Sequence, residues 1–372
     1  MGVSPDVVVV GGGAVGLGVA WRCATAGAKV RVFDSSGGRG ATWAAAGLLA
    51  PVTEVHYGEE PLLALNLESS RRYPTFVAEL EEASGATTGY RQSGTLMVAL
   101  DGDESRALDD LYRFQTSLGL SVERLNGRET RAEEPGLAPN VRAGILVEGD
   151  HQVDNRALLD ALRAACVAAG VEIAADTVKG VEVASDRVVA VVTASEGAVP
   201  CSTVVLAAGS WSGAVEGLPP DAVPPVRPVK GQLLHLRGEV LARRNLRGVE
   251  AYLVPRSDGR LVVGATVEER GWDTTVTAGA VYELLRAAYE LLPGVAELEL
   301  TETVAGLRPG SPDNAPLIGP TSVEGLLLAT GHYRNGVLLT PVTADAIASV
   351  VTGAGMPDWA SHFLPTRFGA AA

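Results

Sequence analysis

Residues 6–36 read as a strand, a glycine turn, a helix and a second strand. The apolar run DVVVVG is followed by GGGAVG, then by the helical pattern AVGLGVAWRCATAG and by KVRVFDSS. Gly11, Gly13 and Gly16 fit the spacing GxGxxG, with the strand before it and the helix after it that this motif needs. The first glycine permits the tight turn, the second lets a pyrophosphate approach the backbone, and the third lets the helix pack on the strand. The opening therefore predicts a βαβ unit that binds a dinucleotide.

The same fingerprint serves nicotinamide and flavin dinucleotides. Asp34 follows the second strand, where a carboxylate can accept a hydrogen bond from an adenosine ribose hydroxyl. The chain then enters the small-residue segment GGRGATWAAAGLLAP, residues 37–51, instead of a further βαβ unit. This interruption favours a flavin dinucleotide that is buried along its length, while a nicotinamide-dependent dehydrogenase remains the outside alternative.

Composition and charge narrow the class of partner. With 372 residues, 47% of them hydrophobic, the chain can bury a large core. Its formal net charge of -14 disfavours nucleic acid and anionic membranes, so a small molecule is the expected partner. The three cysteines form no CxxC pair, the amino terminus has no basic region before its apolar run, and no apolar run approaches the roughly twenty residues of a membrane helix. We therefore expect a cytoplasmic protein.

The rest of the chain predicts an α/β protein in which two domains are interleaved. A helix is expected over NRALLDALRAACVAAG, and apolar strands between about 178 and 206 suit a parallel sheet covered on both faces. From Pro224 onward the pattern is antiparallel, with a hairpin turn at SDGR. We assign residues 1–80, 150–223 and 301–372 to a Rossmann-like cofactor domain, and residues 81–149 and 224–300 to an antiparallel-sheet substrate domain.

Five further segments carry a resemblance to a known family. ATWAAAGLLAP, RPVKGQ, AYLVPRSDGRLVVGAT, AGLRPGSPDNAPLIG and ATGHYRNGVLLTP occur in the order typical of the glycine oxidase and D-amino acid oxidase family of flavoproteins. The chain is similar to this family over nearly its whole length, and most similar to the glycine oxidases of thiamin biosynthesis. The resemblance implies an FAD-dependent oxidase that converts glycine to the imine while oxygen becomes hydrogen peroxide, with sarcosine and small D-amino acids as further candidate substrates. The imine would then supply thiazole synthesis.

The resemblance also implies roles for single residues. A zwitterionic substrate needs a fixed cation for its carboxylate, and Arg308 in AGLRPG corresponds to the family's carboxylate-binding arginine. Tyr252 would add a second bond to that carboxylate, and Arg334 in GHYRNG would lie near flavin and substrate, with the following helix directed at the flavin ring. From the residues alone, a surface salt bridge, a strand aromatic and a helix-capping loop remain the respective alternatives.

The expected cofactor-binding residues include Arg308 and Arg334 and come from all parts of the chain. The others are Gly11, Gly13, Ala14, Val15, Gly16, Asp34, Thr42, Ala45, Ala46, Gly47, Leu49, Val178, Ala208, Gly209, His332, Asn335, Gly336, Val337 and Leu338. Related dehydrogenases link flavin to a histidine at the position of Ala44, so FAD should be bound noncovalently here. Ala50, Glu250 and Val267 are candidates for setting substrate size.

Two alternatives to the oxidase are kept open. One is a dehydrogenase of the same fold that passes electrons to a quinone or a carrier protein, and the other is an FAD-binding module without oxidase activity. Hydride removal from a neutral amine needs no general base, and the five histidines are too scattered to suggest one. They also show neither HxxH nor HExxH spacing, so no metal site is expected. A homo-oligomer is suggested by the resemblance alone.

Overall fold

The computed structural model describes residues 5–368, and its first part is a six-stranded sheet. The sheet has the order β18-β19-β12-β1-β2-β8, and all neighbouring strands are parallel except β18 and β19. The strands come from the beginning, the middle and the end of the chain, which is the interleaving that the sequence predicts. They are β1 (Val7–Val10), β2 (Val30–Phe33), β8 (Glu172–Ala174), β12 (Thr203–Leu206), β18 (Leu317–Pro320) and β19 (Leu326–Thr330).

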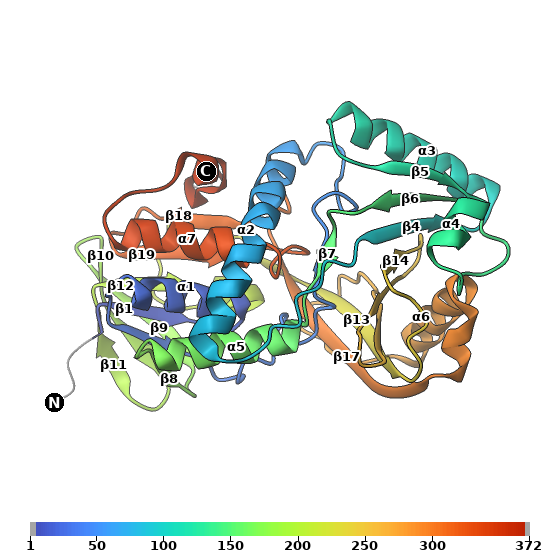
Figure 1. Cartoon of the computed structure of the whole chain (residues 1–372). Helices are drawn as coiled ribbons and strands as arrows, with labels where there is room; N and C mark the ends of the chain where they lie inside the picture. The colour runs from blue at the N-terminus through green and yellow to red at the C-terminus, as the bar shows by residue number, and fades with distance from the viewer. Residues whose placement is uncertain (1–4, 369–372) are drawn as a thin grey trace.

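Three helices cover one face of this sheet, and a fourth packs on two of them (Figure 1). They are α1 (Ala14–Thr25), α2 (Glu60–Ser84), α5 (Asn155–Ala168) and α7 (Thr340–Val351). Helix α1 contacts both α5 and α7, and α2 crosses over α5 and α7. The Asp154 side chain caps α5 by accepting from the backbone N–H groups of Arg156 and Ala157. None of the helices within residues 5–368 is long and apolar enough to cross a membrane.

The opposite face is covered by a separate antiparallel sheet of β9 (Val178–Ala184), β10 (Arg187–Thr193) and β11 (Gly197–Pro200). The expectation of parallel strands throughout residues 178–206 is therefore wrong for these strands and holds only for β12. The physical reason is local, because Ser185 and Asp186 both have positive φ, 51° and 58°, and turn the chain back into a hairpin. Both kinds of strand are apolar when buried, so composition alone did not separate them.

The second part is an eight-stranded sheet with the order β17-β13-β16-β15-β14-β4-β6-β5. Helix α3 (Gly102–Ser117) packs on β4 and β6, α4 (Gly127–Glu133) on β5 and β6, and α6 (Ala278–Leu291) on β13 and β16. The strands are β4 (Thr95–Ala99), β5 (Glu123–Asn126), β6 (Ala143–Val147), β13 (Arg227–Arg237), β14 (Asn245–Arg247), β15 (Tyr252–Pro255), β16 (Arg260–Gly264) and β17 (Glu299–Gly310). As predicted, the SDGR turn joins two antiparallel strands, β15 and β16.

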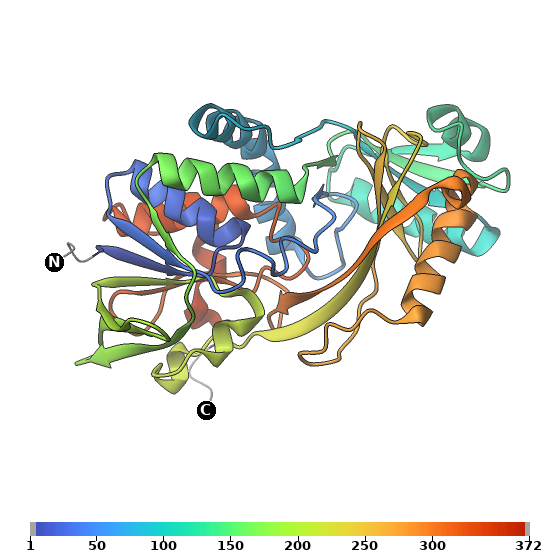
Figure 2. The same cartoon turned by 90° about the horizontal axis from the view of Figure 1, so that it is seen from below.

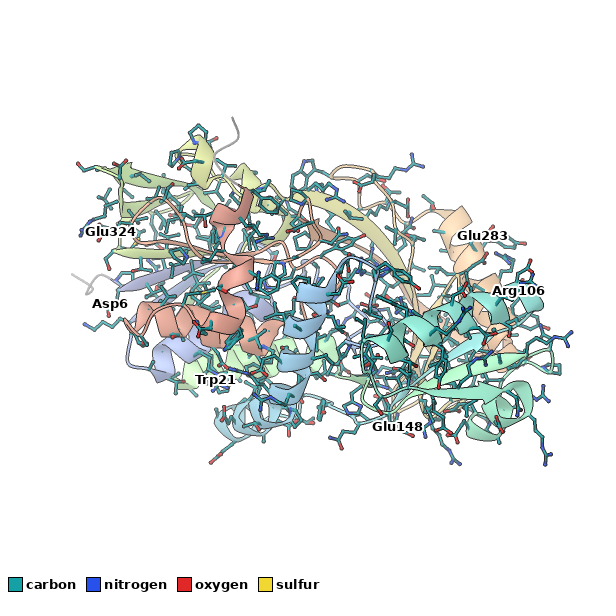
Figure 3. All side chains as sticks on the ribbon, turned by 90° about the horizontal axis from the view of Figure 1, so that it is seen from above. Asp6, Trp21, Arg106, Glu148, Glu283 and Glu324 are labelled. Carbon is teal, nitrogen blue, oxygen red and sulfur yellow. The ribbon has the colours of Figure 1, made fainter. Side chains whose placement is uncertain are left out.

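The long strands β13 and β17 run from the second part toward the first (Figure 2). They are paired antiparallel over their whole length, from Arg227↔Gly310 to Arg237↔Glu299. The predicted boundary assigned residues 301–310 to the cofactor domain, whereas β17 belongs to the eight-stranded sheet. The two parts form opposite ends of the molecule: Figure 3 shows Asp6 and Glu324 at one end, and Arg106 and Glu283 at the other. A small pairing of β3 (Leu48–Leu49) with β7 (His151–Gln152) lies between them.

Candidate active site

A cavity of about 910 Å³ runs from the glycine turn after β1 to the eight-stranded sheet. One end is lined by Gly11 to Gly16 and Asp34, and the other by Tyr252 and Arg308. The volume is in the range of cofactor and ligand pockets, and one cavity joins the glycine turn to Tyr252 and Arg308, which lie far from it in the sequence.

The glycine turn has the close backbone contacts that its motif predicts. Gly11 has φ of +112°, and a Cβ there would clash with the carbonyl oxygen of Ala207 after β12. A Cβ at Gly16 would clash with the carbonyl oxygen of Gly11, so only glycine lets α1 begin this close to the turn. A Cβ at Gly13 would meet only the Thr42 hydroxyl, at 3.3 Å. The residues therefore create a shallow cradle at the amino end of α1.

This cradle fits an anion. Helix α1 has no side-chain cap and no acidic residue in its first turn, although the Ala14 N–H donates to the Thr42 hydroxyl at 3.1 Å. The partial positive charge of the helix end is thus not neutralised by a carboxylate in the first turn of the helix. A pyrophosphate placed there would be stabilised by the helix end. The residues present consequently fit the phosphate groups of a dinucleotide.

Asp34 lies beside the cradle at the end of β2. Its carboxylate accepts from the backbone N–H groups of Ser36 and Gly38 and from the Ser36 hydroxyl. A Cβ at Gly12 would clash with this side chain, so the carboxylate lies directly against the glycine turn. The loop holds Asp34 at the cavity wall, where the predicted ribose contact requires it.

The small-residue segment forms the middle of the cavity wall. Thr42, Ala44, Ala45, Ala46 and Gly47 line it. The Asn155 side chain, at the start of α5, donates to the carbonyl oxygens of Thr42 and Trp43 and fixes this stretch. A Cβ at Gly306 of β17 would lie 2.5 Å from the Ala44 Cβ, so the segment packs tightly on the long strand. Small side chains are needed here because the backbone itself forms the wall.

Tyr252 and Arg308 meet at the other end. Arg308 Nη1 donates to the carbonyl oxygens of Thr266 at 3.0 Å and Lys230 at 3.4 Å, which fixes the guanidinium at the cavity. Burial raises the pKa of the Tyr252 phenol although the neighbouring Arg308 charge lowers it, so the hydroxyl stays protonated and able to donate. A Cβ at Gly231 would clash with the guanidinium, and one at Gly264 with the phenol. Two glycines thus make room for a cation and a donor.

The GHYRNG turn packs against the strand that carries Arg308. The Tyr333 N–H donates to the carbonyl oxygen of Pro309 at 2.9 Å, and His332 forms a bridge with Gly310. Burial lowers the pKa of His332 to about 3, and its Nε2 lies 2.9 Å from the Thr343 hydroxyl, so the ring is neutral. Tyr333 and Arg334 line the cavity. The Arg334 guanidinium is paired with Glu59 at 2.9 Å and stacks on the Tyr333 ring.

Most of the predicted cofactor residues line the cavity, but several do not. Val178, Ala208, Gly209, Gly336 and Val337 line it as well. Leu49 and Leu338 instead face the hydrophobic core, and Asn335 is buried in the turn, where its carbonyl oxygen accepts from the Leu339 N–H. Helix α7 begins only at Thr340, after further turns, so its amino end lies later than the sequence suggested. Of the predicted size-setting residues, Glu250 and Val267 line the cavity and Ala50 is buried elsewhere.

At the end of the cavity that holds Tyr252 and Arg308, two charged residues stand outside every sequence motif. Glu54 and Arg247 both line the substrate end and form an ion pair at 2.8 Å. Neither stands in a motif, because Glu54 follows the small-residue segment in a loop and Arg247 ends the short strand β14. Only the pairing of β14 with β15, which places Arg247 opposite Tyr252, could have indicated that Arg247 lies in the site. Within residues 5–368, no cluster of three or more His, Cys, Asp or Glu side chains could hold a metal ion.

Comparison with known proteins matches residues 6–350 to the family described as FAD dependent oxidoreductase. The glycine oxidase of Geobacillus kaustophilus is 34% identical, over 93% of this chain and 92% of that protein. A crystal structure of glycine oxidase from the same species superimposes with a TM-score of 0.91 at 31% identity, covering 98% of each chain. The bifunctional protein ThiO/ThiG of Trichormus variabilis is 35% identical over 98% of this chain, which spans only 55% of that longer protein.

Proposed function

The chain belongs to the FAD dependent oxidoreductase family, and from that premise we propose that it is an oxidase of glycine. FAD is the cofactor, and the cavity has room for it between the glycine cradle and Arg308. In the proposed reaction glycine loses a hydride from its α-carbon and a proton from its amino group to give the imine, and oxygen takes up two electrons and two protons to give hydrogen peroxide. Sarcosine and small D-amino acids are further candidate substrates.

The observation that carries this proposal is the joint placement of Arg308 and Tyr252 at the substrate end. A guanidinium with a fixed position and a neutral phenol are the two groups that can hold one carboxylate from two directions. Arg308 Nη1 donates to the carbonyl oxygens of Thr266 and Lys230, and these bonds fix the orientation of the guanidinium. The other N–H groups of the guanidinium therefore also have fixed directions. Fixing the carboxylate in this way orients the α-carbon hydrogen for transfer.

When bound, FAD supplies the hydride acceptor and the reaction with oxygen. The protein contributes binding, orientation and a neutral surround. Burial keeps His332 uncharged, and the Arg334 charge is compensated by Glu59. Arg308 is consequently the cation best placed to attract the substrate carboxylate. FAD should be held noncovalently, since a methyl group stands at position 44 where a histidine link would be needed.

We further propose that the imine supplies thiazole synthesis in thiamin biosynthesis. The support is the match to the bifunctional ThiO/ThiG proteins, in which the counterpart of this chain makes up about half of the length. A location in the cytoplasm and a homo-oligomeric state remain predictions from the sequence.

Peroxide production with glycine tests the proposed reaction. The purified holoenzyme should form one peroxide for each glycine consumed. Arg308→Ala should raise the apparent KM for glycine, because losing a charge-assisted bidentate contact costs roughly 2 to 5 kcal/mol. Glycine oxidation that needs an added quinone and yields no peroxide would instead support a dehydrogenase. An unchanged KM in Arg308→Ala would refute the carboxylate assignment.

A further inference from the structure

Arg247 and Tyr252 lie directly opposite each other on neighbouring antiparallel strands. β14 pairs with β15 in the register Arg247↔Tyr252, and β15 pairs with β16 in the register Tyr252↔Gly264. Side chains of directly opposite residues lie on the same face of a sheet and within contact range. Arg308 reaches the same phenol from the other side, since its guanidinium bonds to the carbonyl oxygen of Thr266, two residues beyond Gly264. Tyr252 is therefore flanked by two arginines in one cavity.

Glu54 compensates the second arginine. Its Oε1 accepts from Arg247 Nη1 at 2.8 Å, and the two side chains are only 12% and 23% exposed. Within residues 5–368, this is the one hydrogen bond that either side chain makes, so the Nε and Nη2 groups of Arg247 and the Oε2 atom of Glu54 remain available. Both residues line the cavity, so these free donors and this free acceptor can meet a substrate.

The buried side chain of Asp150 anchors the loop that carries Glu54. The buried Asp150 carboxylate accepts from the backbone N–H groups of Val52 and Thr53 and from the Thr53 hydroxyl, at 3.1, 2.7 and 2.7 Å. These bonds fix the two residues that precede Glu54. The Glu54 carboxylate is thus held beside Arg247 by the fixed backbone as well as by the ion pair.

We propose that the Glu54–Arg247 pair determines which substituents the site accepts on a substrate whose first carboxylate is bound by Arg308 and Tyr252. This inference rests on the proposed function, in which Arg308 and Tyr252 hold that carboxylate. Glu54 cancels the charge of Arg247, so this end of the cavity takes hydrogen or a small uncharged group and rejects a second carboxylate. Without the Glu54 charge, Arg247 becomes a second carboxylate site, and the accepted class extends to amino acids with two carboxylates, such as N-carboxymethylglycine.

The physical basis is the cost of placing like charges together in a partly buried site. A substrate with a second carboxylate would lie beside Glu54, whose charge is weakly screened because the side chain is largely removed from water. A glutamine at the same position keeps the shape and the acceptor oxygen and removes the charge. Arg247 would then offer its guanidinium fork to the incoming carboxylate.

Binding of acetate and malonate, followed by the change in the visible flavin spectrum, tests the proposal without turnover. Acetate reports on the Arg308 site alone, and malonate adds a second carboxylate. Glu54→Gln should raise the malonate-to-acetate affinity ratio at least tenfold, and Glu54→Gln combined with Arg247→Met should return the ratio to the wild-type value. The matched control is Glu283→Gln, which removes an equal charge from an exposed residue of α6 outside the cavity that is paired with Arg286. It should leave the ratio unchanged.

Turnover gives a second readout. The ratio of kcat/KM for N-carboxymethylglycine to that for sarcosine should rise at least tenfold in Glu54→Gln and fall again in the double variant. An unchanged ratio in Glu54→Gln, an equal rise in Glu283→Gln, or a rise that persists in the double variant would overturn the proposal. If the wild-type protein bound no acetate, the assignment of Arg308 as the carboxylate-binding residue would be refuted. The proposed function and this subsite, which both rest on that assignment, would then be refuted as well.

Discussion

Gly231 leaves the space that the Arg308 guanidinium occupies. A Cβ at this position would lie 2.5 Å from Arg308 Cζ, whereas ordinary carbon contacts are about 3.5 to 4.0 Å. The alanine variant must therefore displace the guanidinium by about 1 Å. The backbone has no need to move, because Gly231 lies in the β13–β17 ladder and the obstructing atoms belong to the end of a flexible side chain.

Gly231→Ala should thus separate binding from stability. A misplacement of about 1 Å in a positioning group can cost about 100-fold, or roughly 2.7 kcal/mol, in affinity for the substrate carboxylate. The free energy of unfolding should change by less than about 1 kcal/mol, since alanine in a strand is no worse than glycine. Acetate titration of the flavin spectrum and denaturant unfolding measure the two quantities.

Gly248→Ala is the matched control for this experiment. Gly248 also lines the cavity, but its added Cβ would meet only ordinary contacts, the nearest at 3.5 Å. Acetate affinity in this variant should remain near that of the wild type. If Gly231→Ala bound acetate as tightly as the wild type, Arg308 would not be the group that holds the carboxylate.

Three further predictions concern the cofactor, pH and the thiols. Gly13→Val places a side chain over the amino end of α1 and should purify folded but with little flavin; stoichiometric flavin would contradict the cradle assignment. Burial raises the pKa of Asp150 from 3.8 to about 6, so the folded state binds this proton more tightly than the unfolded chain. The free energy of unfolding of the wild type, relative to that of Asp150→Asn, should therefore fall as pH rises from about 4 to about 6 and then level off. A difference between the two proteins that does not vary with pH would be inconsistent with this. Cys23, Cys166 and Cys201 are buried, and burial raises the pKa of Cys23 to about 12; thiol reagents should react only after unfolding, and fast reaction of the native protein would argue against their burial.

The parts of the fold that sequence predicted best are those with local causes. The glycine turn needs Gly11 and Gly16 because two backbone carbonyl oxygens occupy the space of a side chain, and that requirement is visible as a spacing. The SDGR hairpin is equally local. Arg308 and Tyr252 entered through the resemblance to a family, and the structure brings both to one cavity.

The missed features depend on pairings between distant segments. Glu54 and Arg247 meet only because β14 lies beside β15 and because Asp150 anchors the loop after the small-residue segment. Leu49 and Leu338 are adjacent in sequence to residues that line the cavity, but their own side chains face the core. The antiparallel arrangement of β9 and β10 follows from a two-residue turn with positive φ, which the residue types Ser185 and Asp186 do not require.

The most direct measurement is the visible absorption spectrum of the purified protein before and after anaerobic addition of glycine. We predict a flavin spectrum that glycine bleaches, and admission of air should restore the colour while hydrogen peroxide forms. A yellow protein that glycine, sarcosine and small D-amino acids all leave unbleached would contradict the proposed oxidase function.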